Sequence, residues 1–125
     1  MAVKQNQFRT SDSFVSEISF GCGGYWGLPI FPEKEAQALV EIAIENGINF
    51  FDTGPNYSQG NAEVRMGKLL KPHKNSVHYA TKIGSYLSDS GKRIRDFSKK
   101  RILDSVDNSL LNLQIDQIFL LQFHG

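Results

Sequence analysis

Four short, mainly apolar segments divide the chain into repeats of about 30 to 40 residues. The first, residues 14–20, alternates apolar with polar side chains and runs into a glycine-rich loop at residues 21–24. The other three are residues 48–51, 77–81 and 115–121, which are β-rich or continuously apolar. The pattern therefore predicts four strands, ending near residues 21, 52, 82 and 124.

Three segments between these strands carry apolar residues at helical spacing. Pro32 suits the first turn of one helix, Asn61 can cap a second and Ser98 a third, while Gly47 and Pro72 end the first two. The expected buried stripes are Ala36, Leu39, Val40, Ala43 and Ile44; then Ala62, Met66, Leu69 and Leu70; then Ile102, Leu103, Val106, Leu110 and Leu113. Residues 83–97 are expected to form a long polar loop.

The order of elements is β-α-β-α-β-α-β, which predicts an α/β fold with a parallel sheet, because strands joined through helices must run in the same direction. Two architectures satisfy this order. One is a doubly wound open sheet, and the other is an arc of a (β/α)₈ barrel, whose full size is about 250 residues. The length of 125 residues favours the first architecture, and the chemistry described below favours the second.

The composition excludes several classes of protein. A formal net charge of +1 gives no broad basic surface for nucleic acid or anionic lipid, and no apolar run is long enough to span a bilayer. The single cysteine, Cys22, cannot form an intramolecular disulfide, and residues 1–10 are too polar for a signal peptide, so we expect a cytoplasmic protein. One cysteine and three scattered histidines lack the spacing of a metal site.

Three of the predicted strands end at or near an ionisable residue: Asp52, Lys82 and His124. Tyr57 follows Asp52 by five residues, in the same predicted loop. The carboxyl ends of parallel strands meet on one face of an α/β fold, and in barrels that face holds the active site. The sequence therefore predicts a carboxylate, a phenol, an ammonium and an imidazole around one rim.

These four groups suit the protonation of a carbonyl oxygen. A tyrosine is a weak acid, and a neighbouring ammonium such as that of Lys82 favours release of the phenol proton of Tyr57. Asp52 is expected to keep Lys82 charged and oriented, and His124 to donate a hydrogen bond to the substrate oxygen. The hydride that completes a carbonyl reduction must come from a cofactor.

Three stretches of the chain resemble the aldo-keto reductase family. Residues 47–57, GINFFDTGPNY, followed by Glu63 and Gly67, are similar to the first signature of that family. Residues 80–82, ATK, resemble its third strand with the catalytic lysine, and residues 120–124, LLQFH, resemble its fourth strand with the catalytic histidine. The opening strand is similar too, and the sequence FRT at residues 8–10 resembles part of the family's N-terminal hairpin.

The resemblance implies a partial (β/α)₈ TIM barrel with strands one to four and three helices, formed by residues 1–125 as a single domain that corresponds to the N-terminal half of the barrel. It implies reduction of aldehydes or ketones, or the reverse oxidation of alcohols, with NADPH as the expected cofactor and NADH as the alternative. The substrate is expected to be a small carbonyl or sugar-like compound. The implied catalytic residues are Asp52, Tyr57, Lys82 and His124, and the implied residues near the nicotinamide ribose are Gly23, Gly24 and Asp52.

The chain departs from the family pattern in two respects. Ser58 follows the catalytic tyrosine position, where the family usually has glycine, and the nearest glycine is Gly60. Strands five to eight, with their cofactor-binding groups, do not occur in these 125 residues, so we expect a piece of a longer protein, or a chain that self-associates through open sheet edges. The alternative function is a catalytically inactive truncated barrel that serves as a binding module.

Overall fold

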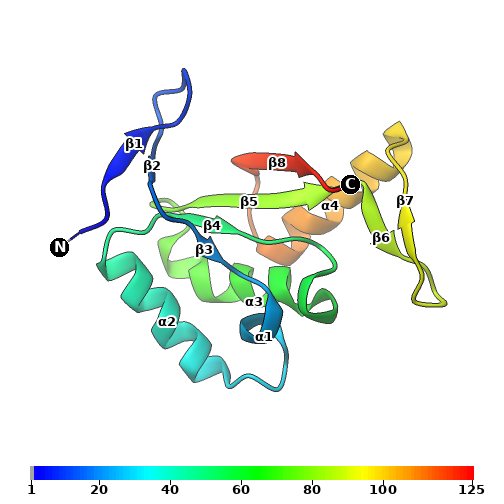
Figure 1. Cartoon of the computed structure of the whole chain (residues 1–125), viewed down its shortest axis with the longest axis horizontal. Coiled ribbons are helices and arrows are strands. Elements are labelled where there is room, and N and C mark those ends of the chain that lie inside the picture. Colours follow the sequence, from blue (N-terminus) through cyan, green and yellow to red (C-terminus); the bar gives the residue numbers. More distant parts are fainter. Residues whose placement is uncertain (1) are drawn as a thin grey trace.

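The computed structural model describes residues 2–125 and contains a four-stranded parallel sheet (Figure 1). Its strands are β3 (Phe20–Gly21), β4 (Phe50–Asp52), β5 (His78–Ile83) and β8 (Leu120–Phe123). They lie side by side in the order β3-β4-β5-β8, and each neighbouring pair is parallel. The predicted α/β fold with four parallel strands is therefore confirmed. The last strand begins at Leu120, five residues later than the predicted position.

Helices fill the connections between these strands, as the sequence predicts. They are α2 (Glu33–Glu45), α3 (Asn61–Leu70) and α4 (Lys99–Leu113). A short helix α1 (Gly24–Gly27) and the 3₁₀ turns η1 (Tyr57–Gly60) and η2 (Lys71–His73) were not predicted. Asn61 is the first residue of α3 and not its cap, because its side-chain amide donates to the carbonyl of Gly27 at 2.7 Å. Within residues 2–125, no helix combines the length and the apolar character needed to cross a membrane.

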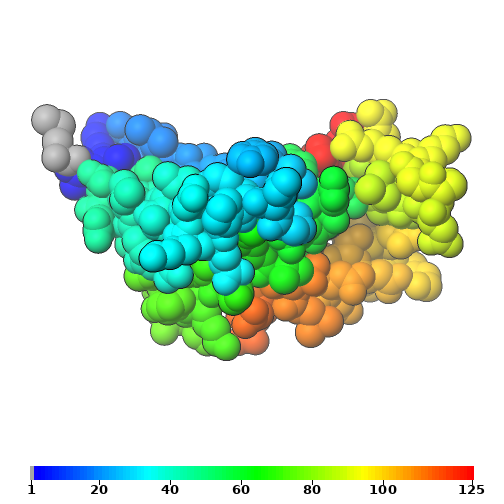
Figure 2. Space-filling view, turned by 90° about the horizontal axis from the view of Figure 1, so that it is seen from below, coloured from blue at the N-terminus to red at the C-terminus, as the bar shows by residue number. Residues whose placement is uncertain are grey.

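The core lies between the sheet and the helices, which cover one side of the molecule (Figure 2). Phe51 and Tyr79 contribute from the strands, and the helices contribute Ala36, Val40, Ala43, Met66, Leu69, Leu70 and Leu113. Two residues of the predicted stripes are exposed instead, Leu39 by 43% and Leu103 by 53%. Leu39 is next to Val40 in the sequence, and Leu103 is next to Ile102. Neighbouring residues are about 100° apart around a helix, so Leu39 and Leu103 lie beside the narrow strip of each helix that faces the sheet.

The predicted first strand is divided in two. Its first part pairs as β2 (Phe14–Ser16) with β1 (Gln5–Gln7) in an antiparallel hairpin, and only Phe20–Gly21 joins the parallel sheet. The break occurs where the Ser16 hydroxyl donates to the carbonyl of Ile18 at 2.7 Å and the chain turns. This hairpin covers the amino ends of the strands, because Phe8 lies with its ring centroid 5.0 Å from that of Phe119.

Residues 83–97 do not form an open loop. Strand β5 continues to Ile83, and the chain then forms a second antiparallel hairpin from β6 (Ser85–Leu87) and β7 (Arg93–Arg95). Residues 93–95 alternate polar with apolar side chains, and Gly91 lies in the turn before them, which is a hairpin signal present in the sequence itself. The hairpin projects at one end of the molecule, in yellow in Figure 2.

A buried glutamate joins the helical layer to the sheet. Glu63 of α3 is fully buried, and its Oε1 accepts hydrogen bonds from Thr81 of β5 at 2.6 Å and from Ser109 of α4 at 2.8 Å. Its Oε2 accepts a third from the side-chain amide of Asn112 at 3.1 Å. Since every donor comes from outside α3, this carboxyl group connects α3 with β5 and α4. The bond to Thr81 fixes β5 at the residue next to Lys82.

Replacing Glu63 with leucine leaves these buried donors without an acceptor. We expect Glu63→Leu to lower the free energy of unfolding by about 3 kcal/mol, measured by urea denaturation. The matched control is Glu33→Ala, which removes an exposed ion pair to Lys68 at 2.6 Å and is expected to cost less than about 1 kcal/mol. Equal losses in the two variants would contradict the connecting role of Glu63.

Candidate active site

The register of the sheet brings the predicted site residues to one face. Asp52 is paired with Ala80, and Lys82, two residues further along β5, is paired with Gln122 of β8. Side chains alternate along a strand, and residues paired in register point the same way. Asp52, Lys82 and Gln122 therefore lie opposite the face that packs on the helices, at the carboxyl end of the strands.

An ion pair lies at the centre of this face. Lys82 Nζ is 2.7 Å from Asp52 Oδ2 and also donates to the carbonyl of Thr53 at 2.6 Å. The other carboxylate oxygen, Oδ1, accepts from the side-chain amide of Gln122 at 2.7 Å. The Lys82 side chain is only 13% exposed, so the ammonium and the carboxylate are held in fixed positions, partly shielded from water.

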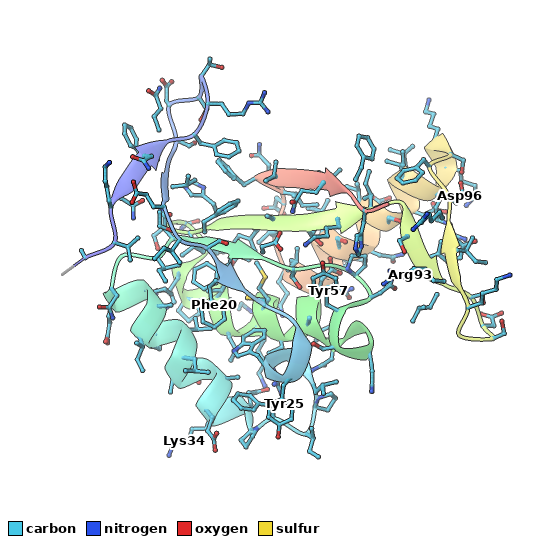
Figure 3. All side chains as sticks on the ribbon, in the orientation of Figure 1. Phe20, Tyr25, Lys34, Tyr57, Arg93 and Asp96 are labelled. Carbon is cyan, nitrogen blue, oxygen red and sulfur yellow. The ribbon has the colours of Figure 1, made fainter. Side chains whose placement is uncertain are left out.

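Tyr57 and His124 lie against this pair. The Lys82 ammonium is 4.6 Å from the centre of the Tyr57 ring, and the His124 imidazole meets the same ring edge to face with 5.9 Å between centroids. The backbone N–H of His124 donates to the carbonyl of Ile83 at 2.8 Å and extends the pairing of β8 with β5. The structure thus brings the four predicted side chains together at the carboxyl end of the sheet, where Figure 3 labels Tyr57.

Two glycines form a cradle for the Tyr57 ring. A Cβ atom at Gly23 would lie 2.9 Å from Cδ2 of Tyr57, and one at Gly54 would lie 3.0 Å from Cε1. A side chain at position 23 would force the ring to shift, and one at position 54 would require the ring to give by a few tenths of an ångström. The ring is therefore held between the loops that follow β3 and β4, with one edge toward each glycine.

The loop after Tyr57 explains how serine occupies the usual glycine position. Ser58 has φ of 55° and Gln59 has φ of 59°, both in the left-handed region that favours glycine, and Gly60 follows at 86°. The Ser58 hydroxyl donates to the carbonyl of Gly24 at 2.7 Å, which offsets part of the conformational cost and ties the loop to α1.

An open cavity of about 520 Å³ adjoins Tyr57. Its lining residues are Gly21, Cys22, Gly23, Gly24, Asp52, Asn56, Tyr57 and Ser58, which include the three predicted cofactor residues. Cβ atoms built at Gly21 and Gly24 would meet nothing within 4 Å, so this part of the wall is open. Within residues 2–125 no three His, Cys, Asp or Glu side chains are grouped as a metal site.

Burial and local charge set the protonation of two site residues. Burial, with a smaller effect of the Asp52 charge, raises the pKa of the Cys22 thiol well above its usual value, so Cys22 contributes a neutral wall. Partial burial lowers the pKa of His124, and the charges of Arg93, Lys82 and Arg95 lower it further, while Asp52 opposes them. His124 is therefore a neutral imidazole at pH 7, able to donate one hydrogen bond and accept another.

The sequence analysis missed two polar residues of this site. Gln122 orients Asp52, and Asn56 donates its side-chain amide to the carbonyl of Ser85 at 2.9 Å and lines the cavity. Gln122 could have been found from the alternation within β8, since it lies two residues before His124 and so on the same face. Asn56 carried no such signal, because its partner belongs to a hairpin that the sequence analysis treated as a loop.

The family model described as "Aldo/keto reductase family" matches residues 17–125. Among curated proteins, the uncharacterized oxidoreductase YqkF of Bacillus subtilis is 33% identical over 125 aligned residues, which cover 98% of this chain and 39% of YqkF. L-galactose dehydrogenase of Arabidopsis thaliana is 39% identical over 117 residues, which cover 88% of this chain and 34% of that protein. The chain thus spans less than half the length of these relatives.

Solved structures of aldo-keto reductases also match nearly the whole of this chain and less than half of their own length. The aldo-keto reductase AKR11C1 from Bacillus halodurans, in its holo form, is 39% identical with a TM-score of 0.84, over 98% of this chain and 40% of its own. The glycerol dehydrogenase AKR11B4 from Gluconobacter oxydans is 29% identical with a TM-score of 0.84, over 99% of this chain and 40% of its own. The elements of this chain are therefore arranged as in part of an aldo-keto reductase TIM barrel.

The lowered pKa of His124 gives a test of the site's electrostatics. We expect an NMR titration to place the midpoint of the His124 imidazole below about 6.5, the ordinary histidine value, and Arg93→Gln to raise it. Since the folded state binds this proton less readily than the unfolded chain, the free energy of unfolding should fall as pH drops from about 6.5 to the folded midpoint. The resonance is assigned with His124→Gln, and a midpoint above 6.5 in the unmodified chain would contradict the arrangement of charges.

Proposed function

Because the chain belongs to the aldo/keto reductase family, we propose that it carries the catalytic part of an NAD(P)H-dependent oxidoreductase that reduces aldehydes or ketones to alcohols or catalyses the reverse oxidation. The observation that carries this proposal is the contact of the Tyr57 ring with both the Lys82 ammonium, at 4.6 Å, and the His124 imidazole, at 5.9 Å. A cation and a neutral hydrogen-bonding ring thus both contact the proton donor Tyr57, which lines the open cavity.

In this proposal Tyr57 is the general acid. Its phenol O–H donates the proton to the carbonyl oxygen during reduction and takes a proton from the alcohol during oxidation. The nearby Lys82 ammonium stabilises the phenolate that the transfer leaves behind, because opposite charges attract strongly in a partly desolvated site. A positioned proton donor of this kind contributes about 10²–10⁴-fold to the rate.

Asp52 and His124 have supporting roles in the proposal. Asp52, itself oriented by Gln122, holds the Lys82 ammonium at the Tyr57 ring. The neutral imidazole of His124 donates a hydrogen bond to the substrate oxygen as negative charge develops on it. A neutral His124 suits this role at pH 7, since it can donate to the oxygen without adding a second full positive charge beside Lys82.

The cofactor proposal rests on the cavity beside Tyr57. Gly23, Gly24 and Asp52 line its wall, and they are the residues that we propose hold the nicotinamide ribose, with NADPH as the expected cofactor and NADH as the alternative. Such a cofactor supplies the hydride when bound, which no side chain can do. The side chains of this chain position the carbonyl and move the proton.

The relatives narrow the expected substrate. L-galactose dehydrogenase and glycerol dehydrogenase are named for a sugar and a polyol, and we propose that this chain likewise acts on a small carbonyl or sugar-like compound. We further propose that residues 1–125 form one domain that corresponds to the N-terminal half of a (β/α)₈ barrel, since the match to AKR11C1 covers 98% of this chain and 40% of that one.

The test measures cofactor binding and turnover by the purified 125-residue chain. NADPH binding is followed by fluorescence, and turnover by reduction of 4-nitrobenzaldehyde. We expect Tyr57→Phe to reduce turnover by about 10²–10⁴-fold while leaving the Kd for NADPH nearly unchanged, because only the proton donor is lost.

The control variant for this test is Tyr25→Phe, which removes a phenol that is 62% exposed and outside the cavity lining, and which should keep the original rate. Equal rates for Tyr57→Phe and the unmodified chain would remove Tyr57 as the proton donor. Absence of NADPH binding by the unmodified chain would instead favour the binding-module alternative.

A further inference from the structure

The β6–β7 hairpin is fixed beside the candidate active site. Asn56, which lines the cavity, donates its side-chain amide to the carbonyl of Ser85 at 2.9 Å. The backbone N–H of Asp96 donates to the carbonyl of Gly84 at 3.0 Å and closes the base of the hairpin. Figure 3 shows Arg93 on this hairpin at the same end of the sheet as Tyr57. The hairpin is therefore anchored to the loop that carries Tyr57.

The two faces of the hairpin differ in character. Arg93 is paired with Leu87, and Arg95 with Ser85, so these four side chains share one face. Tyr86 and Ile94 form the other face, and Arg101 of α4 lies over the Tyr86 ring at 3.8 Å. Since the tyrosine face packs toward α4, the arginine face points away from that helix.

The polar groups of the arginine face have no partners within residues 2–125. Arg93 and Arg95 are exposed, and neither guanidinium forms an ion pair or donates a hydrogen bond to another described residue. Ser85 is buried, with 6% of its surface exposed, and its hydroxyl oxygen lacks a hydrogen-bond partner among the described residues. A buried hydroxyl without a partner is unfavourable, so this position is suited to an incoming polar atom.

The positive charges of the arginine face act on His124, at the carboxyl end of the sheet. Arg93 and Arg95 both lower the pKa of His124, and Arg93 does so more strongly than Lys82, which belongs to the site itself. A substrate whose carbonyl lies against Tyr57 and His124 is thus within the field of both arginines. A negatively charged substituent on such a substrate would gain from that field.

We propose that the arginine face of the hairpin, defined by Arg93, Arg95 and Ser85, binds an oxyanionic group, a carboxylate or a phosphate, on the substrate whose carbonyl is reduced at Tyr57. This inference rests on the proposed function and specifies its substrate class. Guanidinium groups match the geometry of carboxylate and phosphate oxygens and form charge-assisted hydrogen bonds with them. The hairpin acts as a specificity element, while the proton transfer is left to Tyr57.

The experiment compares 4-formylbenzoate with its neutral methyl ester, methyl 4-formylbenzoate, as substrates of the 125-residue chain. The readout is the ratio of kcat/KM for the acid to kcat/KM for the ester. We expect the double variant Arg93→Gln, Arg95→Gln to lower this ratio about tenfold or more relative to the unmodified chain, mainly through KM for the acid. Because the ratio is compared between variants, the different intrinsic reactivities of the two aldehydes cancel.

The matched control is Lys92→Gln, which removes one positive charge from the turn of the same hairpin and should keep the original ratio. An unchanged ratio in the double variant would overturn the proposal. So would an equal loss in Lys92→Gln, since the effect would then report net charge alone. A higher Kd for NADPH in the double variant, with an unchanged acid-to-ester ratio, would assign the arginines to cofactor binding. That result would also overturn the proposal.

A second pair of substrates distinguishes the two oxyanions. Glyceraldehyde 3-phosphate is compared with glyceraldehyde, and a larger effect of the double variant on this pair than on the benzoate pair would identify a phosphate as the preferred group. The reverse order would identify a carboxylate.

The binding of 4-formylbenzoate, measured by titration calorimetry, separates this proposal from the proposed function. If neither aldehyde is reduced, the proposed function fails, and the calorimetry alone decides the present inference. Binding that is lost in the double variant and retained in Lys92→Gln supports the oxyanion site. Equal affinities in the three proteins, or no binding to any of them, contradict it.

Discussion

The parallel register between β4, β5 and β8 is the constraint on which the rest of the site depends. Because Asp52 is paired with Ala80 and Lys82 with Gln122, a single alternation of side chains directs all the polar groups to one face and the core residues to the other. A slip of one residue would bury Lys82 among the helices and expose Tyr79. The hydrophobic burial that holds β5 in register therefore also determines where the ammonium lies.

The electrostatics of the site follow from this arrangement. The ammonium of Lys82 is partly desolvated, and it is balanced by Asp52, whose other oxygen is occupied by Gln122. The same ammonium lies 4.6 Å from the centre of the Tyr57 ring, and its charge also lowers the pKa of His124. The glycine cradle at Gly23 and Gly54 fixes the other side of that ring, so the phenol is held from several directions before any ligand binds.

Much of this architecture could be predicted from the sequence, and the exceptions have physical reasons. The end of β4 at Asp52 was predictable because the apolar run stops abruptly there, and the helices were predictable because their stripes are regular. Strand β5 ends at Ile83, one residue beyond the predicted end at Lys82. Residues 14–20 were wrongly joined into one strand, since alternation does not reveal the turn made by Ser16. The β6–β7 hairpin was missed because its polar composition resembles that of a loop, and with it the partner of Asn56.

The central claim is that Tyr57, Lys82 and His124, which are far apart in the sequence, meet at the carboxyl end of the parallel sheet. It is tested most directly by nuclear Overhauser effects in the 125-residue chain. The account predicts cross-peaks between the ring protons of Tyr57 and those of His124, together with cross-peaks from the Tyr57 ring to the side-chain methylene protons of Lys82. A folded chain in which the Tyr57 ring shows contacts to neither residue would contradict the account.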